Sequence, residues 1–272
     1  MKALDPAAAR AVVPRPAATT LVLRDGAHGL KVLMVRRSPT ATFMPGSFVF
    51  AGGAVDAADM AASAASDESV DRLNTRIGVV AGVRSQAPAY AVAALRECLE
   101  ECGLWLGTDA PLPALPALRA RLHAGEPLAA LAGEAGLSLH TAALQPWSHW
   151  VTPLGLPKRF DTLFFVVRAP SEQEPSVDAG ETTTLAWMPP AQALQQHVQG
   201  AFPMEFATVR MVQTLLPFAE RGVNALLSHS AAQRALPPLH PRLVLDATRH
   251  VTGVRLPGDA GYATLDGDDD GP

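Results

Sequence analysis

Glu97, Glu100 and Glu101 bring three acidic side chains together within one short stretch of the sequence. In a helix, residues three or four positions apart share a face, so these carboxylates would point the same way. Like charges at this spacing cost an isolated helix about 0.2–0.5 kcal/mol per pair. A divalent cation would compensate them, because hard cations such as Mg²⁺ take carboxylate oxygens as ligands. The alternative is an acidic helix face in water.

The element that must position these acids is a helix predicted from Tyr90 to Leu104. Gly103 is a typical stop signal just after the last turn. Cys98 and Cys102 lie four residues apart on the apolar side, and we expect them to pack in the core rather than to bind a metal as thiolates. The other apolar positions of this side are Ala91, Ala94, Leu95 and Leu99.

The residues from Arg96 to Leu104 read R-E-C-L-E-E-C-G-L. This stretch resembles the second half of the Nudix box, R-E-U-x-E-E-x-G-U, in which U is aliphatic and Cys98 takes the first such place. Upstream, Phe50-Ala51-Gly52-Gly53 resembles the F-P-G-G that leads into the box, with alanine for proline. The chain is therefore similar to the Nudix hydrolases.

This box is interrupted. Gly53 and Arg96 are 43 positions apart, which implies an insertion over about 56–88. Asp59 stands six residues after Gly53, where the family has a glutamate that pairs with the arginine. The partner of Arg96 is thus open, with Asp56 and Asp59 as candidates. We expect the insertion to lie at the rim of the site.

A second resemblance concerns the substrate. The segment from Leu33 to Gly53 is similar to the signature of the coenzyme A diphosphatases of the superfamily, L-L-T-x-R-[SA]-x3-R-x3-G-x3-F-P-G-G. Thr42 stands in the place of its second arginine. The positions that agree are Leu33, Arg37, Ser38, Gly46, Phe50, Gly52 and Gly53.

The segment from Trp150 to Phe165 resembles W-x-T-P, R-R-F-D-T and F-F of the coenzyme A diphosphatases with an interrupted box, with Lys158 for one arginine. Lys158 and Arg159 are candidates for contact with a polyphosphate; the alternative is a solvated strand entry. Glu181 is a candidate additional base or metal ligand, with capping or loop packing as the alternative.

The resemblance implies Glu97, Glu100 and Glu101 as ligands of Mg²⁺ or Mn²⁺, Glu100 as the first choice of base, and Arg96 as a brace between loop and helix. The candidate substrate-binding residues are Arg37, Phe50, Gly52, Gly53, Lys158 and Arg159; for Arg37 the alternative is a cation at the end of a strand. The implied activity is hydrolysis of a pyrophosphate bond in coenzyme A or acyl-coenzyme A. Alternatives are hydrolysis of NADH, nucleotide sugars or other nucleotides, or a non-catalytic nucleotide-binding module.

The implied fold is an α/β/α sandwich around a mixed sheet with additional helices. We expect a flexible N-terminus over 1–18, one Nudix domain over 19–255 with a helical embellishment over about 111–145, and a mobile acidic tail over 256–272. The strands expected are Thr19–Arg24, Lys31–Arg37, Ser47–Phe50, a piece starting at Trp147, Leu163–Val167, Glu181–Met188 and Arg242–Leu245. Later helices are expected over Pro190–Gln199, Met204–Phe218 and Val223–His229.

Composition limits the remaining classes of function. The formal charge is −4 and 48% of the residues are hydrophobic, so a disordered chain or a nucleic-acid-binding surface is not indicated. No apolar run approaches the roughly 18 residues of a membrane span. Two cysteines do not make a disulfide framework. We therefore expect a cytoplasmic protein that acts on a small nucleotide, without membrane or nucleic-acid partners; the sequence is compatible with a homodimer.

Overall fold

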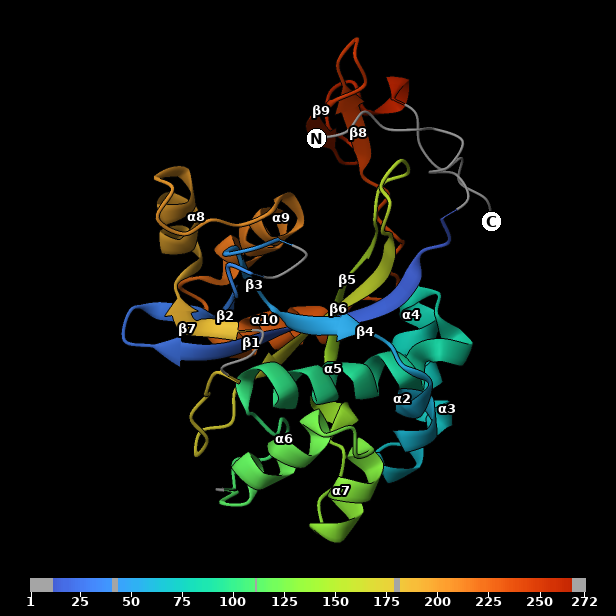
Figure 1. The fold of residues 1–272 in the computed structure, drawn as a ribbon, viewed down its shortest axis with the longest axis vertical. Coiled ribbons are helices and arrows are strands. Elements are labelled where there is room, and N and C mark those ends of the chain that lie inside the picture. The colour runs from blue at the N-terminus through green and yellow to red at the C-terminus, as the bar shows by residue number, and fades with distance from the viewer. Residues whose placement is uncertain (1–11, 41–43, 111, 179–181, 266–272) are drawn as a thin grey trace.

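The computed structural model describes residues 12–40, 44–110, 112–178 and 182–265. A mixed sheet of seven strands forms its centre (Figure 1). The strand order is β3-β2-β1-β6-β5, with β4 paired to β1 and β7 paired to β2. β1 and β6 are parallel, and the other pairs are antiparallel. The strands are β1 (Arg15–Gly26), β2 (Gly29–Arg37), β3 (Phe48–Val49), β4 (Ala51–Ala54), β5 (Gln145–Val151), β6 (Phe160–Arg168) and β7 (Thr182–Met188).

One face of the sheet is covered by α5 (Ala87–Cys102), the predicted helix with its three acids. Alternate residues of a strand point to opposite faces, and on β1 Ala18 and Val22 join the core beneath α5. Helices of the insertion and of the embellishment extend this layer. They are α2 (Ala57–Ala61), η1 (Ala62–Ala65), α3 (Val70–Leu73), η2 (Asn74–Gly78), α4 (Val79–Ala81), η3 (Arg84–Gln86), α6 (Leu115–His123), α7 (Leu128–Glu134) and η4 (Thr141–Ala143).

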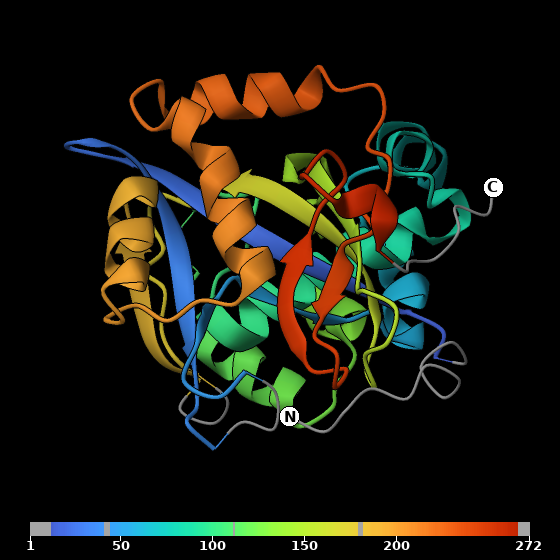
Figure 2. The same ribbon diagram turned by 90° about the horizontal axis from the view of Figure 1, so that it is seen from above.

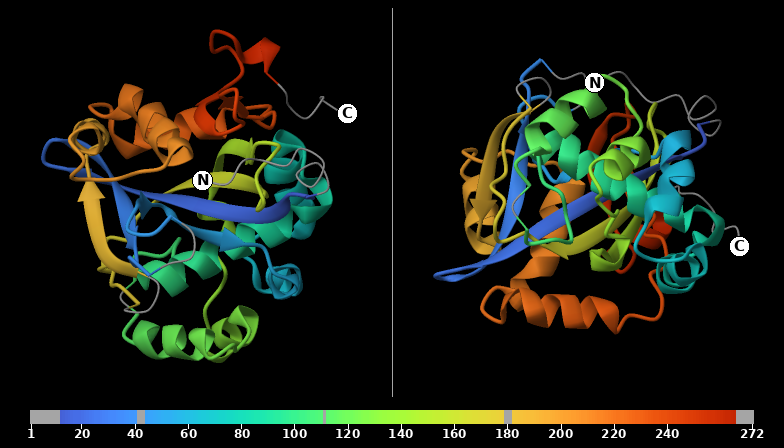
Figure 3. Two further views of the ribbon diagram at one scale, coloured as in Figure 1. Left: turned by 45° about the horizontal axis from the view of Figure 1, so that its top comes forward. Right: turned by 90° about the horizontal axis from the view of Figure 1, so that it is seen from below.

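The opposite face of the sheet is covered by the helices that follow β7. Leu21 and Leu23 of β1 belong to this second core, with Met211 and Val212 of α9 and Leu226 of α10. Figure 3 shows the sheet between these helices and α5. The α/β/α sandwich is therefore confirmed. The elements here are α8 (Pro190–Val198), α9 (Phe206–Leu215), η5 (Leu216–Phe218) and α10 (Gly222–Ala231).

The expected chain ends need correction. β1 already begins at Arg15, because its first residues pair with β6, so 15–18 is not a flexible terminus. At the other end, β8 (Arg242–Leu245) pairs with β9 (Val251–Arg255), followed by η6 (Tyr262–Thr264). Leu256 is buried, and Arg242 donates hydrogen bonds to the carbonyls of Tyr262 and Leu265, so the predicted mobile tail starts too early. Figure 2 shows this hairpin beside α9.

The insertion packs against the rest of the domain and contains a largely buried ion pair of its own. Leu73 and Ile77 are fully buried in the core beneath α5. The guanidinium of Arg76 binds the carboxylate of Glu68, whose side chain is 3% exposed, and donates to the carbonyl of Thr141 at 2.8 Å. Burial of a charge is tolerated when it is paired and hydrogen-bonded. These contacts tie the insertion to the segment before β5. Within the described residues, no helix combines the length and apolar character that crossing a membrane requires.

Candidate active site

The helix α5 carries the three acids because its other side is buried. Pro88 lies in its first turn, where a missing amide hydrogen costs no helix bond, and Gly103 closes its end at φ 64°. Cys98 and Cys102 are free and buried, as predicted. The apolar side fixes the rotation of α5, so Glu97, Glu100 and Glu101 all line one cleft above β4.

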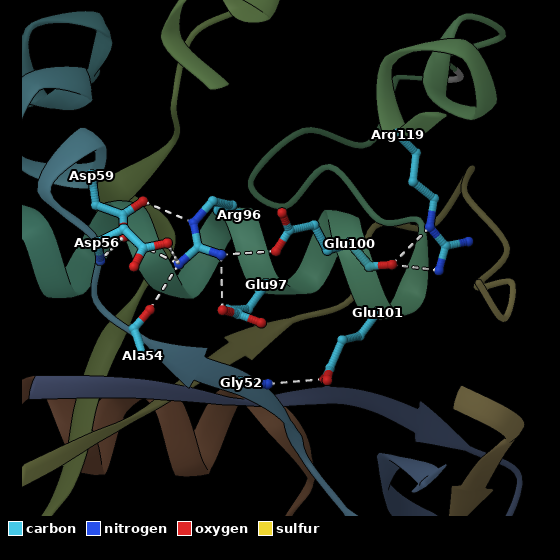
Figure 4. Close-up of polar contacts among 9 residues, drawn as sticks. All are labelled: Gly52, Ala54, Asp56, Asp59, Arg96, Glu97, Glu100, Glu101 and Arg119. Carbon is cyan, nitrogen blue, oxygen red and sulfur yellow. Dashed lines mark hydrogen bonds and ion pairs between the residues drawn. The ribbon is translucent and has the colours of Figure 1, made fainter. Parts of the chain in front are cut away.

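Arg96 joins the insertion to α5 through a network of ion pairs (Figure 4). Its Nε and Nη2 donate to the two oxygens of Asp59 at 2.9 and 3.1 Å. Its Nη1 donates to Glu97 Oε1 and Glu100 Oε2, both at 2.8 Å. Asp56 is 62% exposed and its carboxylate lies 3.8 Å away. Asp59 is therefore the partner of Arg96, at the position six residues after Gly53.

The glycines before the insertion let β4 approach α5 closely. The amide of Gly52 donates to Glu101 Oε2 at 3.0 Å, and Glu101 is only 5% exposed. A Cβ on Gly52 would lie 2.5 Å from the carbonyl oxygen of Ala18. A Cβ on Gly53 would lie 2.3 Å from Glu97 Oε1. Any side chain at either position would therefore displace the backbone or the carboxylate.

Gly53→Ala should lower kcat by about 10²-fold, because a shift of roughly 1 Å at a catalytic group has that effect. The methyl group would push Glu97 out of its position. Steady-state kinetics checks this. The control is Gly133→Ala on α7, where an added Cβ meets nothing within 4 Å. Equal kinetics of Gly53→Ala and the wild type would contradict the positioning of Glu97 by Gly53.

A cleft of about 650 Å³ runs along these acids. Eight of the predicted site residues line it: Arg37, Phe50, Gly52, Gly53, Glu97, Glu100, Glu101 and Lys158. Within the described residues, none of the residues that line the cleft comes from the insertion, which meets the site through the contact of Asp59 with Arg96. The short helices of the insertion bury their apolar residues beneath α5, and the predicted place of the insertion at the rim of the site stays a prediction. Glu181 and Thr42 lie outside the described residues.

Arg159 does not line the cleft. It is 5% exposed, and it donates to the carbonyl of Thr152 at 3.0 Å and to that of Val12 at 3.1 Å. The predicted contact of Arg159 with a polyphosphate does not agree with this position, because the Arg159 side chain is buried and points away from the cleft. Arg159 instead links two segments of the chain: the one before β1, through Val12, and the one after β5, through Thr152.

Further residues of the cleft were missed from the sequence. Arg15 lies at the start of β1, and its place follows from the parallel pairing of Arg15 with Phe160, which no local pattern signals. His123 ends α6, a helix of the embellishment in which the sequence predicted no site residue. The remaining missed residues are Ala17, Thr19, Met44, Val49, Ala54, Leu122, Thr152, Phe160, Thr162, Phe164, Asp178, Ala207 and Thr208.

Burial and crowding perturb the acids of the cleft. Burial raises the pKa of Glu97 to about 7, against the opposing charge of Arg96 and with the help of the charge of Glu100. Burial also raises the pKa of Glu100, again against Arg96. For Arg96 itself, burial lowers the pKa, but the hydrogen bond to Asp59 and the surrounding carboxylates raise it above its ordinary value. One guanidinium thus does not neutralise this group of acids.

The metal-free protein should lose stability as the pH rises from about 5 to about 8. The pKa of Glu97 is about 7 in the folded state and 4.5 for an ordinary glutamate. The folded state therefore binds the proton more tightly, and this stabilisation is complete below 4.5 and lost as the pH rises through 7. Thermal unfolding in a chelator at both pH values checks this. Between the two pH values, Tm should drop less for Glu97→Gln than for the wild type. An equal drop in the two proteins would contradict the assignment of the raised pKa to Glu97.

A divalent cation fits the oxygen donors of this cleft, although their present arrangement does not enclose one. Within the part of the chain that the structure describes, no three or more Asp, Glu, His or Cys side chains are placed to hold a metal ion. Two carboxylates nevertheless converge on one positive group, since Arg96 Nη1 lies 2.8 Å from both Glu97 and Glu100. Glu101 faces the same cleft. These are hard oxygen donors of the kind that Mg²⁺ and Mn²⁺ prefer.

No family model matches the chain. The chain is 28% identical over 283 residues to human acyl-coenzyme A diphosphatase NUDT19, covering 87% of this chain and 73% of the human protein. It is 27% identical over 183 residues to putative nudix hydrolase 7 of Caenorhabditis elegans, covering 64% of this chain and 52% of the worm protein. The chain thus spans about half the length of the worm relative.

Among solved structures, the chain is similar to a NUDIX hydrolase from Alicyclobacillus acidocaldarius. The two share 30% sequence identity with a TM-score of 0.67, and the similarity covers 80% of this chain and 97% of the other. Sequence identity at this level over nearly the whole of the relative, together with the box residues in one cleft, identifies the family. The chain belongs to the Nudix hydrolases.

Proposed function

We propose that this protein hydrolyses the pyrophosphate bond of coenzyme A or acyl-coenzyme A with the help of Mg²⁺ or Mn²⁺. The observation that carries the proposal is the presence of Glu97, Glu100 and Glu101 in one cleft with the cations Arg37 and Lys158. The human relative and a Xenopus laevis relative, 25% identical over 207 residues, are named acyl-coenzyme A diphosphatases. The chain covers 54% of the Xenopus protein, so its substrate is part of the proposal.

In this proposal Glu97, Glu100 and Glu101 hold the metal ions. A bound divalent ion supplies neutralisation of the diphosphate charge and stabilisation of the leaving phosphate. Arg96 keeps the carboxylates of Glu97 and Glu100 together and fixes them to the insertion through Asp59. Glu101 is oriented by the amide of Gly52.

Glu100 is the proposed acceptor of a proton from the attacking water. Its side chain is 21% exposed, against 12% for Glu97, so water reaches it from the cleft. Its raised pKa makes it a better proton acceptor than an ordinary glutamate. Glu181 stays a prediction as an additional base or metal ligand.

Arg37 and Lys158 are the proposed contacts for the phosphates, and Phe50 offers an apolar wall in the same cleft. The backbone at Gly52 and Gly53 lets the diphosphate approach the acids without interference from a side chain. Water adds to one phosphorus, the P–O–P bond breaks, and a proton is released. The products from coenzyme A are 3′,5′-ADP and 4′-phosphopantetheine, or its acylated form from acyl-coenzyme A.

A substrate panel tests the proposal. Purified protein with Mg²⁺ or Mn²⁺ is incubated with coenzyme A, acetyl-coenzyme A, NADH, ADP-ribose and diadenosine polyphosphates, and the products are separated by chromatography. The highest kcat/KM should be for a coenzyme A species. A preference for a substrate without pantetheine would overturn the coenzyme A assignment, and binding without turnover of any compound would favour a nucleotide-binding module.

Three further expectations stay predictions. They are the choice between Mg²⁺ and Mn²⁺, a homodimer, and a cytoplasmic location. Metal titration of the activity addresses the first, and light scattering after gel filtration addresses the second. Neither result alters the proposed roles of the acids on α5.

A further inference from the structure

Arg15 and Lys158 lie together at one end of the cleft, although only Lys158 was expected there. Arg15 begins β1 and pairs in parallel register with Phe160, two residues after Lys158. The amide of Arg15 donates to the carbonyl of Arg159 at 2.9 Å, which fixes the two chain segments side by side. Both cationic side chains are exposed, and neither forms an ion pair with an acid that the structure describes.

We propose that Arg15 and Lys158 form a subsite for the 3′-phosphate of the nucleotide end of coenzyme A. This inference rests on the proposed function. A phosphate monoester carries a charge of about −1.5 to −2 at pH 7 and offers three acceptor oxygens. Two cations with free access to the cleft match that charge, and arginine suits a phosphate especially well because its donors form a planar fork.

The position of the pair relative to the acids suits this role. Arg15, Ala17 and Thr19 are alternate residues of β1, and all three line the cleft. Ala18 lies opposite Gly53, the residue in contact with Glu97. Arg15 and Ala18 are three positions apart on the strand, which is about 10 Å. A ribose with a phosphate on each side spans that gap when the flexible cationic side chains reach inward. The small side chain of Ala17 leaves the space between them open.

The residues around Arg15 and Lys158 also indicate which end of the substrate binds beside them. Phe160 lies beside the pair and gives an apolar surface for the ribose or base. At another part of the cleft, His123 and Asp178 also line a second cavity of about 610 Å³. That cavity has apolar walls that include Leu115 and Ala120 and leaves room for the other arm of the substrate. The nucleotide is therefore assigned to the end with Arg15 and Lys158.

The test compares coenzyme A with 3′-dephospho-coenzyme A, which lacks only the phosphate in question. Arg15→Ala should raise KM for coenzyme A by roughly tenfold, as expected for loss of a charge-assisted contact. KM for dephospho-coenzyme A and kcat for both substrates should change by less than about twofold. Arg15→Lys should restore part of the preference. Lys31→Ala is the matched control, because it removes a cation opposite Arg24 near the far end of β1.

Binding measurements keep this inference separate from the proposed function. Calorimetry should give tighter binding of 3′,5′-ADP than of 5′-AMP to the wild type, and the double variant Arg15→Ala/Lys158→Ala should lose that difference. Thermal unfolding verifies that the variants fold. An equal rise in KM for coenzyme A and for dephospho-coenzyme A would overturn the subsite, since the two cations would then contact another part of the substrate. Equal binding of the two nucleotides by the wild type would overturn it even if coenzyme A is not hydrolysed.

Discussion

Glu100→Gln should lower kcat for coenzyme A by about 10²–10⁴-fold, the usual contribution of a general base. The substitution removes the negative charge and the proton acceptor but keeps the shape of the side chain. Glu100 is partly exposed, and its carboxylate binds Arg96 Nη1 at 2.8 Å, a contact that a glutamine oxygen can still accept. The fold should therefore persist. Steady-state kinetics with saturating Mg²⁺ or Mn²⁺ measures the effect.

Glu101→Gln gives an independent check on the same site. Glu101 is buried, yet a glutamine can keep the hydrogen bond from the Gly52 amide. The loss of one carboxylate charge should weaken metal binding and turnover. Glu134→Gln is the control, because Glu134 is 60% exposed on α7 and pairs with Arg121. Full activity of both variants on α5 would reject this helix as the catalytic element.

Asp59→Ala should lower the free energy of unfolding by about 3–5 kcal/mol, the usual result when one partner of a buried ion pair is removed. The side chain of Asp59 is 2% exposed and that of Arg96 is 12% exposed, and two hydrogen bonds join them. Without Asp59, the guanidinium keeps its bonds to Glu97, Glu100 and the carbonyl of Ala54, and the exposed carboxylate of Asp56 lies 3.8 Å away. Urea unfolding followed by circular dichroism measures the change.

Asp71→Ala is the matched control, since Asp71 is an exposed acid of the same insertion. Its unfolding free energy should stay within about 0.5 kcal/mol of the wild type, as for most surface substitutions. Asp59→Ala should also lower kcat, because Arg96 loses the anchor that holds it between the insertion and α5. A variant as stable as Asp71→Ala would contradict the role of Asp59 as the fixed partner of Arg96.

The local patterns of the sequence were enough for most of the framework. The α5 helix and its stop at Gly103 depend on neighbouring residues, and the structure has both. The expected strand over Ser47–Phe50 is shortened to β3, and β4 follows it as a second strand, because Phe48 pairs with β2 whereas Ala51 pairs with β1. That division depends on strands distant in sequence.

The cleft was predicted less completely than the helix that carries its acids. Arg15 and Phe160 meet through parallel pairing of β1 and β6, which lie more than a hundred residues apart. Lys158 and Arg159 look equivalent in sequence, but the packing of Arg159 against the carbonyls of Thr152 and Val12 removes it from the cleft. Such differences arise from tertiary packing, and a motif cannot encode them.

The central claim is that Glu97, Glu100 and Glu101 hold a divalent ion beside the diphosphate. Anomalous diffraction from crystals grown with Mn²⁺ tests it most directly. We expect a manganese peak in contact with these carboxylates, with Arg96 Nη1 released from at least one of its two glutamate partners. No manganese peak at these three side chains, in a protein that hydrolyses coenzyme A with Mn²⁺ in solution, would contradict the account.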